Sequence, residues 1–134
     1  MTQIQYKKVF ITGANGFIGK KLAEKFRSLG ADVCGMDMIG NVEGNIAQGN
    51  LSTPDKWRDT LKGCDLVIHT AAVVSNALSH EQTWQVNVAG TKVVLDEAIA
   101  CGSVNKKSVS YRALAVDAGH GTLFPFGPAV LSKW

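Results

Sequence analysis

The stretch of sequence that decides the fold is Thr12-Gly-Ala-Asn-Gly-Phe-Ile-Gly19. It follows a run of β-branched and aromatic residues, 8–12, that predicts a short buried strand. Beyond it, apolar residues recur at helical spacing over residues 17–30, and a glycine is placed to end that helix. A second apolar run covers residues 31–36. A strand, a helix and a strand within about thirty residues predict a β-α-β unit with parallel strands.

The three glycines of this stretch have separate expected roles at a dinucleotide site. Gly13 makes a tight turn, Gly16 lets the backbone approach a pyrophosphate, and Gly19 lets the helix pack closely on the strand. Free N–H groups at the start of the helix then face the phosphates, aided by the positive end of the helix dipole. The alternative is a glycine-rich turn that binds no ligand. The predicted binding residues of the turn are Gly13, Asn15, Gly16, Phe17, Ile18 and Gly19.

An acidic residue, Asp37, closes the second predicted strand, roughly twenty residues beyond the first glycine, where a dinucleotide site needs a carboxylate. Such a carboxylate accepts hydrogen bonds from the adenosine ribose and repels a 2′-phosphate. No arginine follows within the next few residues to bind that phosphate. NAD is therefore favoured over NADP, and the alternative is an ordinary aspartate in a surface turn.

The remaining sequence continues the alternation of strands and helices. A loop with one short strand around residues 45–48 is expected, then a short helix that Thr53 caps, with Pro54 in its first turn and Trp57 and Leu61 buried. Residues 65–72 are a nearly continuous apolar run, which predicts a strand covered on both faces. A long helix is expected over residues 81–101, a half-exposed strand over 108–116, and no long regular element over 117–134.

The composition is that of one soluble globular domain. Hydrophobic residues make up 46% and charged residues 19% of 134 residues. The net charge of +3 is spread over separated lysine pairs, so no nucleic-acid partner is expected. No run reaches the roughly 18 apolar residues of a membrane span. The N-terminus lacks the pattern of a secretory signal, which favours the cytoplasm.

Neither the cysteines nor the histidines have the spacing of a metal site, so no metal is expected. The three cysteines are far apart in sequence and are expected to be small buried residues in a reducing compartment. These six residues are Cys34, Cys64, Cys101, His69, His80 and His120.

With these motifs in view, the sequence resembles the extended short-chain dehydrogenases of the NAD-dependent epimerase/dehydratase group, and within them the 3β-hydroxysteroid dehydrogenase branch. Five motifs occur in the family's order over roughly residues 7–104. They are Thr12–Gly19, Asp37, Gly49-Asn-Leu51, Val67-Ile-His-Thr-Ala-Ala72 and Asn87-Val-Ala-Gly-Thr91.

The resemblance adds further residues to the predicted cofactor site. It places Met38, Asn50 and Leu51 on the adenosine side, with Asn50 where the family has Asp. It places Thr70, Ala71 and Ala72 under the ribose and nicotinamide, and it gives Asn87 the role of positioning the cofactor and tying its helix to the sheet. Ordinary strand packing and a plain helix-start asparagine are the competing interpretations of the last two groups.

The resemblance stops after Gly102. The family continues with an apolar strand, a Ser/Thr-rich triplet and a Tyr-x-x-x-Lys pair, in which Tyr is the general acid/base and Lys lowers its pKa. Here neither Tyr6 nor Tyr111 has a lysine four residues on, and only Ser108 and Ser110 resemble the triplet. The catalytic residues are therefore unknown. A truncation, or a frame or splice change after about Val104, would give this pattern.

The sequence as a whole predicts an α/β fold, a Rossmann-type parallel sheet flanked by helices and incomplete at its C-terminal end. Residues 1–104 form the dinucleotide-binding domain and residues 105–134 a divergent tail. Three functions remain open. The chain is the NAD-binding portion of an oxidoreductase or epimerase that transfers hydride at a secondary alcohol or ketone, or a binding module without chemistry, or an interaction fragment that pairs through an uncovered sheet edge, for example as a homo-oligomer.

Overall fold

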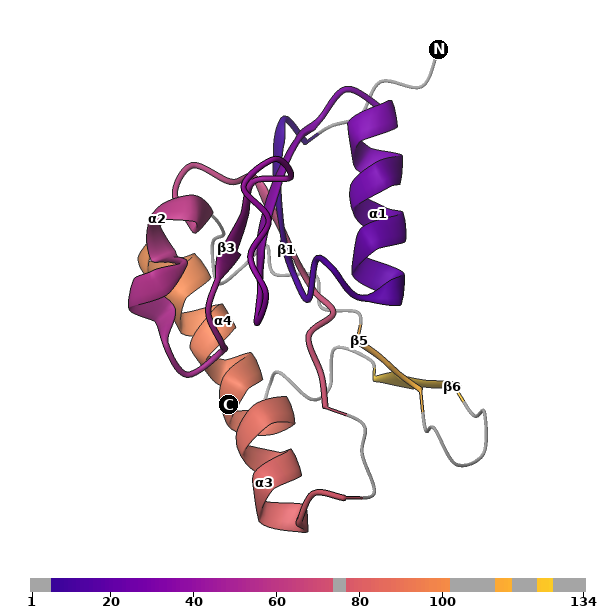
Figure 1. Cartoon of the computed structure of the whole chain (residues 1–134), viewed down its shortest axis with the longest axis vertical. Helices are drawn as coiled ribbons and strands as arrows, with labels where there is room; N and C mark the ends of the chain where they lie inside the picture. Colours follow the sequence, from indigo (N-terminus) through magenta and orange to yellow (C-terminus); the bar gives the residue numbers. More distant parts are fainter. Residues whose placement is uncertain (1–5, 74–76, 102–112, 117–122, 127–134) are drawn as a thin grey trace.

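The computed structural model describes residues 6–73, 77–101, 113–116 and 123–126. Its centre is a parallel sheet of four strands in the order β3-β2-β1-β4 (Figure 1). The strands of this sheet are β1 (Lys8–Thr12), β2 (Asp32–Asp37), β3 (Ile46–Gln48) and β4 (Leu66–His69). The predicted parallel sheet is confirmed, and the short third strand lies where the sequence placed it.

Helices cover both faces of the sheet. The first helix, α1 (Phe17–Ser28), packs on β1 and β2 from one side. The other side carries α2 (Arg58–Leu61), which follows the 3-10 turn η1 (Pro54–Lys56), and α4 (Gly90–Ala100), as Figure 1 shows. None of the helices within residues 6–73 and 77–101 has the length and apolarity to cross a bilayer.

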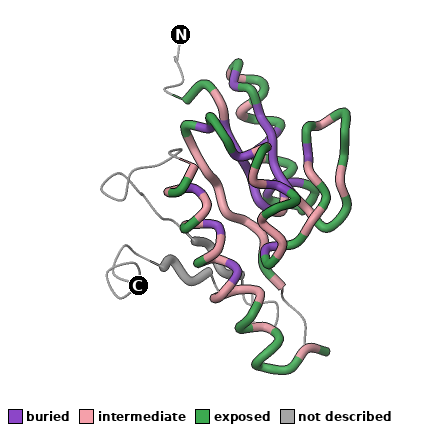
Figure 2. Tube along the Cα trace, turned by 90° about the vertical axis from the view of Figure 1, so that its left-hand side faces the viewer, coloured by how far each residue is buried: buried purple, intermediate pink, exposed green. Residues whose placement is uncertain are grey.

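The alternation of side chains along β1 divides the core in two. Val9 and Ile11 lie in the cluster beneath α1, whereas Phe10 lies with Trp57 in the cluster beneath α2 and α4. All three β1 side chains are fully buried. Figure 2 shows that the buried residues concentrate on the strands and on the inner faces of the helices. The three consecutive apolar residues of β1 therefore contribute to the core on both faces of the sheet.

The end of α1 confirms the role predicted for Gly30. That residue has φ +90°, a conformation that glycine adopts without strain. Its N–H donates to Arg27 O at 3.0 Å, and the next N–H, of Ala31, reaches back to Phe26 O at 3.0 Å. These two bonds are the Schellman arrangement, which satisfies carbonyl groups at the helix end.

The predicted capping by Thr53 is wrong. Its hydroxyl makes no bond to the helix start, but instead accepts the backbone N–H of Asn50 at 3.1 Å and donates to the same residue's carbonyl oxygen. The threonine therefore closes the loop before the helix. Pro54 does occupy the first helical position, and Trp57 and Leu61 are fully buried, as predicted.

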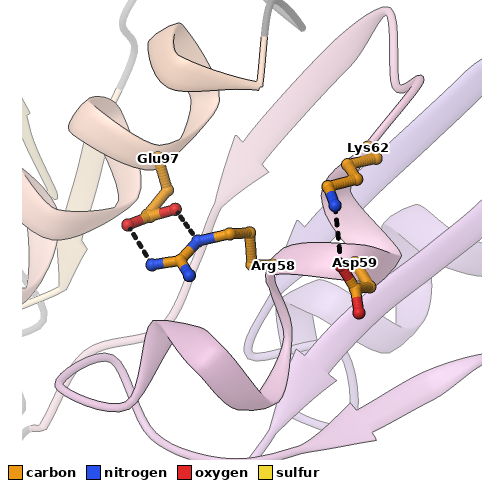
Figure 3. A network of polar contacts seen from close by, with 4 residues as sticks. All are labelled: Arg58, Asp59, Lys62 and Glu97. Atoms are coloured by element: carbon orange, nitrogen blue, oxygen red, sulfur yellow. Dashed lines mark hydrogen bonds and ion pairs between the residues drawn. The ribbon is translucent and has the colours of Figure 1, made fainter.

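Ion pairs tie the second helical layer together. Arg58 of α2 makes a two-pronged pair with Glu97 of α4, with Nε–Oε2 at 2.6 Å and Nη2–Oε1 at 2.9 Å (Figure 3). This contact lowers the pKa of Glu97. The neighbouring pair, Lys62 with Asp59, is exposed and spans one helical turn. Exposed pairs of this kind contribute little to stability, whereas the two-pronged pair fixes one helix against the other.

The predicted long helix is confirmed and contains an irregularity. It begins as α3 (His80–Trp84), widens to a π-turn, η2 (Gln85–Ala89), and continues as α4. Ser79 and Gln82 form a capping box at its start. At the π-turn, the Gly90 N–H donates to Gln85 O, five residues earlier. The wider turn lies at the motif that the sequence singled out.

Two later predictions are modified. The strand expected over 65–72 ends at His69, because the Thr70 N–H is shared between the carbonyl and the hydroxyl of Thr12 and the Ala71 N–H bonds only to that hydroxyl. Its residues are only half-buried, since β4 has one neighbouring strand among the described residues. Within 108–116, the described strand is β5 (Ala113–Val116), which pairs antiparallel with β6 (Leu123–Phe126), a short strand that the sequence did not predict. Ser108, Ser110 and Tyr111 lie outside the described residues.

Candidate functional site

The topology creates a crevice between β1 and β4. From β1 the chain runs outward through β2 and β3, then returns to place β4 on the other side of β1. Connections from the two strands therefore leave in opposite directions at their carboxyl ends. In open parallel sheets, ligands bind at this switch point. The glycine turn follows β1 and residues 70–73 follow β4, so both segments border the crevice.

The glycine turn is fixed by close backbone contacts. Gly13 has φ +67°, and a Cβ there would lie 2.9 Å from Ala71 N. A Cβ at Gly19 would lie 2.1 Å from Gly13 O, which no side chain can tolerate. Both glycines are thus needed for packing. Gly16 differs, since a Cβ there meets only Gly13 O, at 3.2 Å. The position of the middle glycine is therefore less crowded than those of the other two.

A further glycine, Gly35, supports the turn from beneath, and sequence reasoning missed it. It lies inside β2, and a Cβ there would stand 2.3 Å from Ile11 O and 2.8 Å from the Cβ of Ala14. The turn can therefore sit directly on the sheet. A glycine inside an otherwise apolar strand was the available signal, because it marks close approach of another backbone.

The start of α1 carries uncompensated positive charge. Its N-cap, Gly16, has no side chain to accept the first N–H groups, and no acidic residue lies in the first turn. Phe17 and Ile18 are 85% and 42% exposed, so their side chains do not cover the helix end. Free N–H groups and the helix dipole together favour an anion at this point.

Asp37 connects the turn to the next part of the crevice. Its carboxylate accepts the backbone N–H of Asn15 at 2.9 Å and of Met38 at 2.7 Å. The Asn15 side chain donates to Ile39 O at 2.6 Å, which holds the turn to the end of β2. The structure thus brings together Asn15, Asp37 and Met38, three residues that the sequence assigned to the cofactor site. Each carboxylate oxygen keeps acceptor capacity for a further donor.

Beyond Asp37 lies a hollow of about 480 Å³. Met38 and Asn50, both predicted site residues, line it. Leu51 does not contribute its side chain, which is buried in the core. A Cβ on Gly90 would lie 2.7 Å from Leu51 Cδ1, so the leucine packs directly under α4. Of the predicted adenosine-side residues, Leu51 is therefore a packing residue that leaves only its backbone for a ligand.

Residues 70–72, which follow β4, form the floor of the crevice. The hydroxyl of Thr12, at the end of β1, holds this floor in place. This fully buried oxygen accepts the N–H groups of Thr70 at 3.1 Å and of Ala71 at 3.2 Å. The Thr70 hydroxyl in turn donates to Thr12 O at 2.6 Å. The predicted floor residues Thr70 and Ala71 are therefore held beside the glycine turn, and Ala72 follows as an exposed residue.

His69 links this floor to the helical layer, a role the sequence did not reveal. Its Nδ1 lies 2.6 Å from Thr12 Oγ1, and its Nε2 lies 2.9 Å from Thr91 Oγ1. The Thr91 hydroxyl donates to Asn87 O, so it must accept from His69. Nε2 therefore carries the proton, and Nδ1 accepts from Thr12. Burial lowers the pKa of His69 to about 4, which keeps the ring neutral.

Asn87, in the π-turn, holds the segment after β4. Its Oδ1 accepts the Val73 N–H at 2.8 Å, and its Nδ2 donates to Val73 O at 2.9 Å. One side chain thus makes the pair of bonds that a neighbouring strand would make. Asn87 therefore joins the long helix to the segment that follows β4, as the resemblance implied. We refer to Thr12, His69, Thr91 and Asn87 as the polar relay.

A catalytic tyrosine is not found among the described residues of the crevice. Tyr6 precedes β1 and is exposed, so it lies at the amino end of the strands, opposite the glycine turn. In the part of the chain that the structure describes, no group of three or more His, Cys, Asp and Glu side chains is placed to hold a metal. The described crevice therefore offers groups for binding and no evident proton donor.

Comparisons with known proteins agree on the fold and the family. The model of the NAD dependent epimerase/dehydratase family matches residues 9–111. Sterol-4-alpha-carboxylate 3-dehydrogenase, decarboxylating, of Dictyostelium discoideum is 28% identical, over 78% of this chain and 33% of its own length. The chain thus spans about a third of that relative.

Solved structures give the same result. WbmH of Bordetella bronchiseptica, in complex with NAD⁺, is 28% identical with a TM-score of 0.61, over 72% of this chain and 36% of its own. A short-chain dehydrogenase/reductase superfamily protein of Agrobacterium tumefaciens has a TM-score of 0.64 at 24% identity, over 94% of this chain and 42% of its own. The Rossmann-type fold predicted from the sequence is confirmed.

Proposed function

Because the chain belongs to the NAD-dependent epimerase/dehydratase family, we propose that it is the NAD(H)-binding portion of an oxidoreductase or epimerase of the extended short-chain dehydrogenase type. The parent reaction is hydride transfer at a secondary alcohol or ketone. When bound, NAD would accept or supply the hydride. The residues of this chain bind and orient the cofactor and hold the floor beneath it.

The open, uncapped start of α1 beside Asp37 carries this proposal. Gly16 has no side chain to cover the turn, and the helix end attracts an anion such as a pyrophosphate. Asp37 lies next to that anion position through its bond to Asn15 N–H, where it can accept ribose hydroxyls. An anion position with a diol acceptor beside it fits a dinucleotide better than a lone phosphate.

Binding of NADH to the purified chain tests the proposal. Replacing Gly16 with Ala adds one atom 3.2 Å from Gly13 O and is expected to change affinity little. Gly16→Val places methyl groups in the anion position and is expected to weaken binding by at least about tenfold. Thermal unfolding checks that both variants fold. If fluorescence titration gives the same curve for all three proteins, NADH does not bind at this turn.

We also propose a preference for NAD over NADP, set by Asp37. A 2′-phosphate beside this carboxylate brings like charges together, at a cost on the order of 1–3 kcal/mol. Asp37→Ser is expected to reduce the preference for NAD over NADP. Asp37→Asn is expected to reduce it as well, with the smallest change in the shape of the side chain. Equal affinity of the unaltered chain for the two cofactors would contradict this assignment.

A second candidate function is dinucleotide binding without turnover. The observation that favours it is the place of Tyr6 at the far end of the strands, combined with the absence of a Tyr-x-x-x-Lys pair from the sequence. A general acid/base typically contributes about 10²–10⁴-fold to such reactions. We therefore expect this chain to bind NADH and not to oxidise secondary alcohols. Turnover that is lost in Tyr111→Phe would contradict this expectation.

A further inference from the structure

Two of the three cysteines are in contact inside the core. Cys34, within β2, and Cys64, just before β4, are 30 positions apart in the sequence, and their sulfur atoms lie 3.5 Å apart. The two residues are 4% and 2% exposed. The third cysteine, Cys101, is half-buried. The burial that the sequence predicted for Cys34 and Cys64 is therefore confirmed, whereas their contact is a feature that their spacing did not reveal.

The surroundings of the two sulfurs are apolar side chains and backbone carbonyls. Both residues belong to the buried cluster beneath α2 and α4. Cys34 Sγ lies 3.5 Å from Val9 O and 3.4 Å from Thr60 O, and Cys64 Sγ lies 3.7 Å from Thr60 O. A thiol is a weak hydrogen-bond donor. Loss of both S–H groups on oxidation therefore removes only weak hydrogen bonds.

The two sulfurs are carried by segments of different rigidity. Cys34 lies inside the sheet, in register with Phe10 of β1. Cys64 lies in the turn after α2, where its N–H donates to Leu61 O at 3.2 Å. The preceding residue, Gly63, has φ +79°, and a Cβ there would meet no other atom of the described chain within 4 Å. A disulfide needs the sulfurs to approach by about 1.5 Å, and the uncrowded turn at Gly63 can supply this movement.

We propose that Cys34 and Cys64 are a redox-sensitive pair, which hydrogen peroxide closes into a disulfide between β2 and the segment before β4. One sulfur attacks a peroxide oxygen, so that an S–O bond forms, the O–O bond breaks, and the leaving hydroxide takes that thiol's proton to become water. The second sulfur then attacks the first. The S–S bond forms, the S–O bond breaks, and the hydroxyl leaves with the second thiol proton as another water. The two sulfurs lose two electrons in total, and the peroxide gains them.

The disulfide acts on the stability of the fold. It closes a loop of about 30 residues in the unfolded chain and thereby lowers the entropy of that state. Cys64 precedes β4, at the end of the sheet opposite the glycine turn, so the bond does not involve the residues that border the crevice. We expect the closed pair to raise Tm by roughly 10 °C. This inference is independent of the proposed dinucleotide site.

The experiment treats the purified chain with hydrogen peroxide and follows it by peptide mapping and thermal unfolding. We expect a Cys34–Cys64 disulfide and a rise in Tm, both reversed by dithiothreitol, in the unaltered chain and in Cys101→Ser. Cys64→Ala is the matched control, which cannot form the bond and is expected to show no rise. Each protein is compared with its own untreated sample, so a lower starting stability of Cys64→Ala does not affect the result. Oxidation of Met38, which is 71% exposed, shows that the dose of peroxide was sufficient.

Three results would overturn the inference. If Met38 is oxidised while Cys34 and Cys64 both stay as thiols, their contact is ordinary core packing. If either cysteine is converted to a sulfinic or sulfonic acid and no Cys34–Cys64 bond forms, the two sulfurs cannot meet within the fold. If the bond forms and Tm falls or stays the same, the closed pair does not stabilise the chain. A reversible disulfide with a higher Tm, absent from Cys64→Ala, supports it.

Discussion

The two sides of the crevice are built in different ways. The glycine turn after β1 is shaped by backbone contacts, because Gly13 and Gly19 bring chain segments closer than any side chain allows. The segment after β4, residues 70–73, is shaped by side chains of the polar relay, which reach it from β1 and from the long helix. The glycine turn therefore depends on the absence of side chains at its glycines, and the segment after β4 depends on specific side-chain hydrogen bonds.

This difference has a consequence for tolerance to change. A backbone that is packed against backbone cannot move aside for one new methyl group. A hydrogen-bonded side chain can be shortened or exchanged, at the cost of one unsatisfied partner. We therefore expect a single substitution in the glycine turn to lower the free energy of unfolding strongly. A substitution that removes one hydrogen bond to residues 70–73 is expected to lower it by a smaller amount.

The largest effect is expected for Gly19→Ala. The new Cβ would lie 2.1 Å from Gly13 O and 3.1 Å from Ala14 Cα, both of which are backbone atoms. We expect a loss of about 3 kcal/mol or more in the free energy of unfolding, in the range of severe overpacking. Urea unfolding followed by circular dichroism measures it. Gly16→Ala is the control, with an expected change below about 1 kcal/mol.

A similar loss in both variants would show that glycine is needed along the turn for a reason other than the close contact at Gly19. A loss in neither would show that the turn can relax as a side-chain network does.

The sequence was most informative where a feature depends on neighbours along the chain. The Schellman end at Gly30, the turn at Gly13 and the first position of Pro54 are local, so residue type and order were enough to predict them. The cap predicted for Thr53 was local as well, and it failed because the hydroxyl has a competing backbone partner three residues earlier.

The polar relay was not predicted because its partners are distant in sequence. Thr12 and His69 are 57 positions apart, and His69 and Thr91 are 22 apart. Each residue lies in a motif that the resemblance singled out, but only Asn87 received a role from it. A buried histidine on an apolar strand gives no sign in the sequence of which nitrogen is protonated or which hydroxyls it meets. Leu51 illustrates the converse, since its motif suggested a ligand contact and its side chain is in the core.

The second effect is a dependence of stability on pH, which arises from His69 beside the floor of the crevice. His69 has a folded pKa of about 4, below its ordinary value of 6.5. The unfolded chain therefore binds more protons between these values, and stability falls as pH decreases from 6.5 to 4. The full contribution is about 3 kcal/mol. Urea unfolding at a series of pH values measures the slope, and His69→Gln is expected to reduce it.

Carboxylates do not explain a slope in that window. The pKa values of Asp65 and Glu97 are lowered by their hydrogen-bonded partners, so their contributions are lost mainly at more acidic pH. A slope between pH 6.5 and 4 that is the same in His69→Gln would mean that another group causes it.

The third effect concerns the Thr12 hydroxyl. Thr12→Val keeps the shape of the side chain, leaves the Ala71 N–H without its acceptor and leaves the Thr70 N–H with only its longer bond to Thr12 O, at 3.3 Å. We expect a loss of about 1–3 kcal/mol, because one buried acceptor is removed and its partners stay. Thr12→Ser retains the hydroxyl and is expected to lose less. Equal stability of the Val variant and the parent would mean that water or a shifted carbonyl replaces the hydroxyl.

The smallest effect tests whether the polar relay acts as one unit. Thr12 and Thr91 share no direct bond, but both contact the ring of His69, on opposite nitrogens. Loss of the Thr12 donor allows the ring to protonate Nδ1 instead, and that tautomer no longer donates to Thr91. The effects of Thr12→Val and Thr91→Val should therefore not add. We expect a coupling of about 0.5–1 kcal/mol in a double-mutant cycle, with the double variant more stable than the sum of the single losses predicts. The same cycle in a His69→Gln background is expected to lose the coupling. Additive losses in the parent background would show that the threonines stabilise their segments independently, so that the floor, like the glycine turn, consists of separate local contacts.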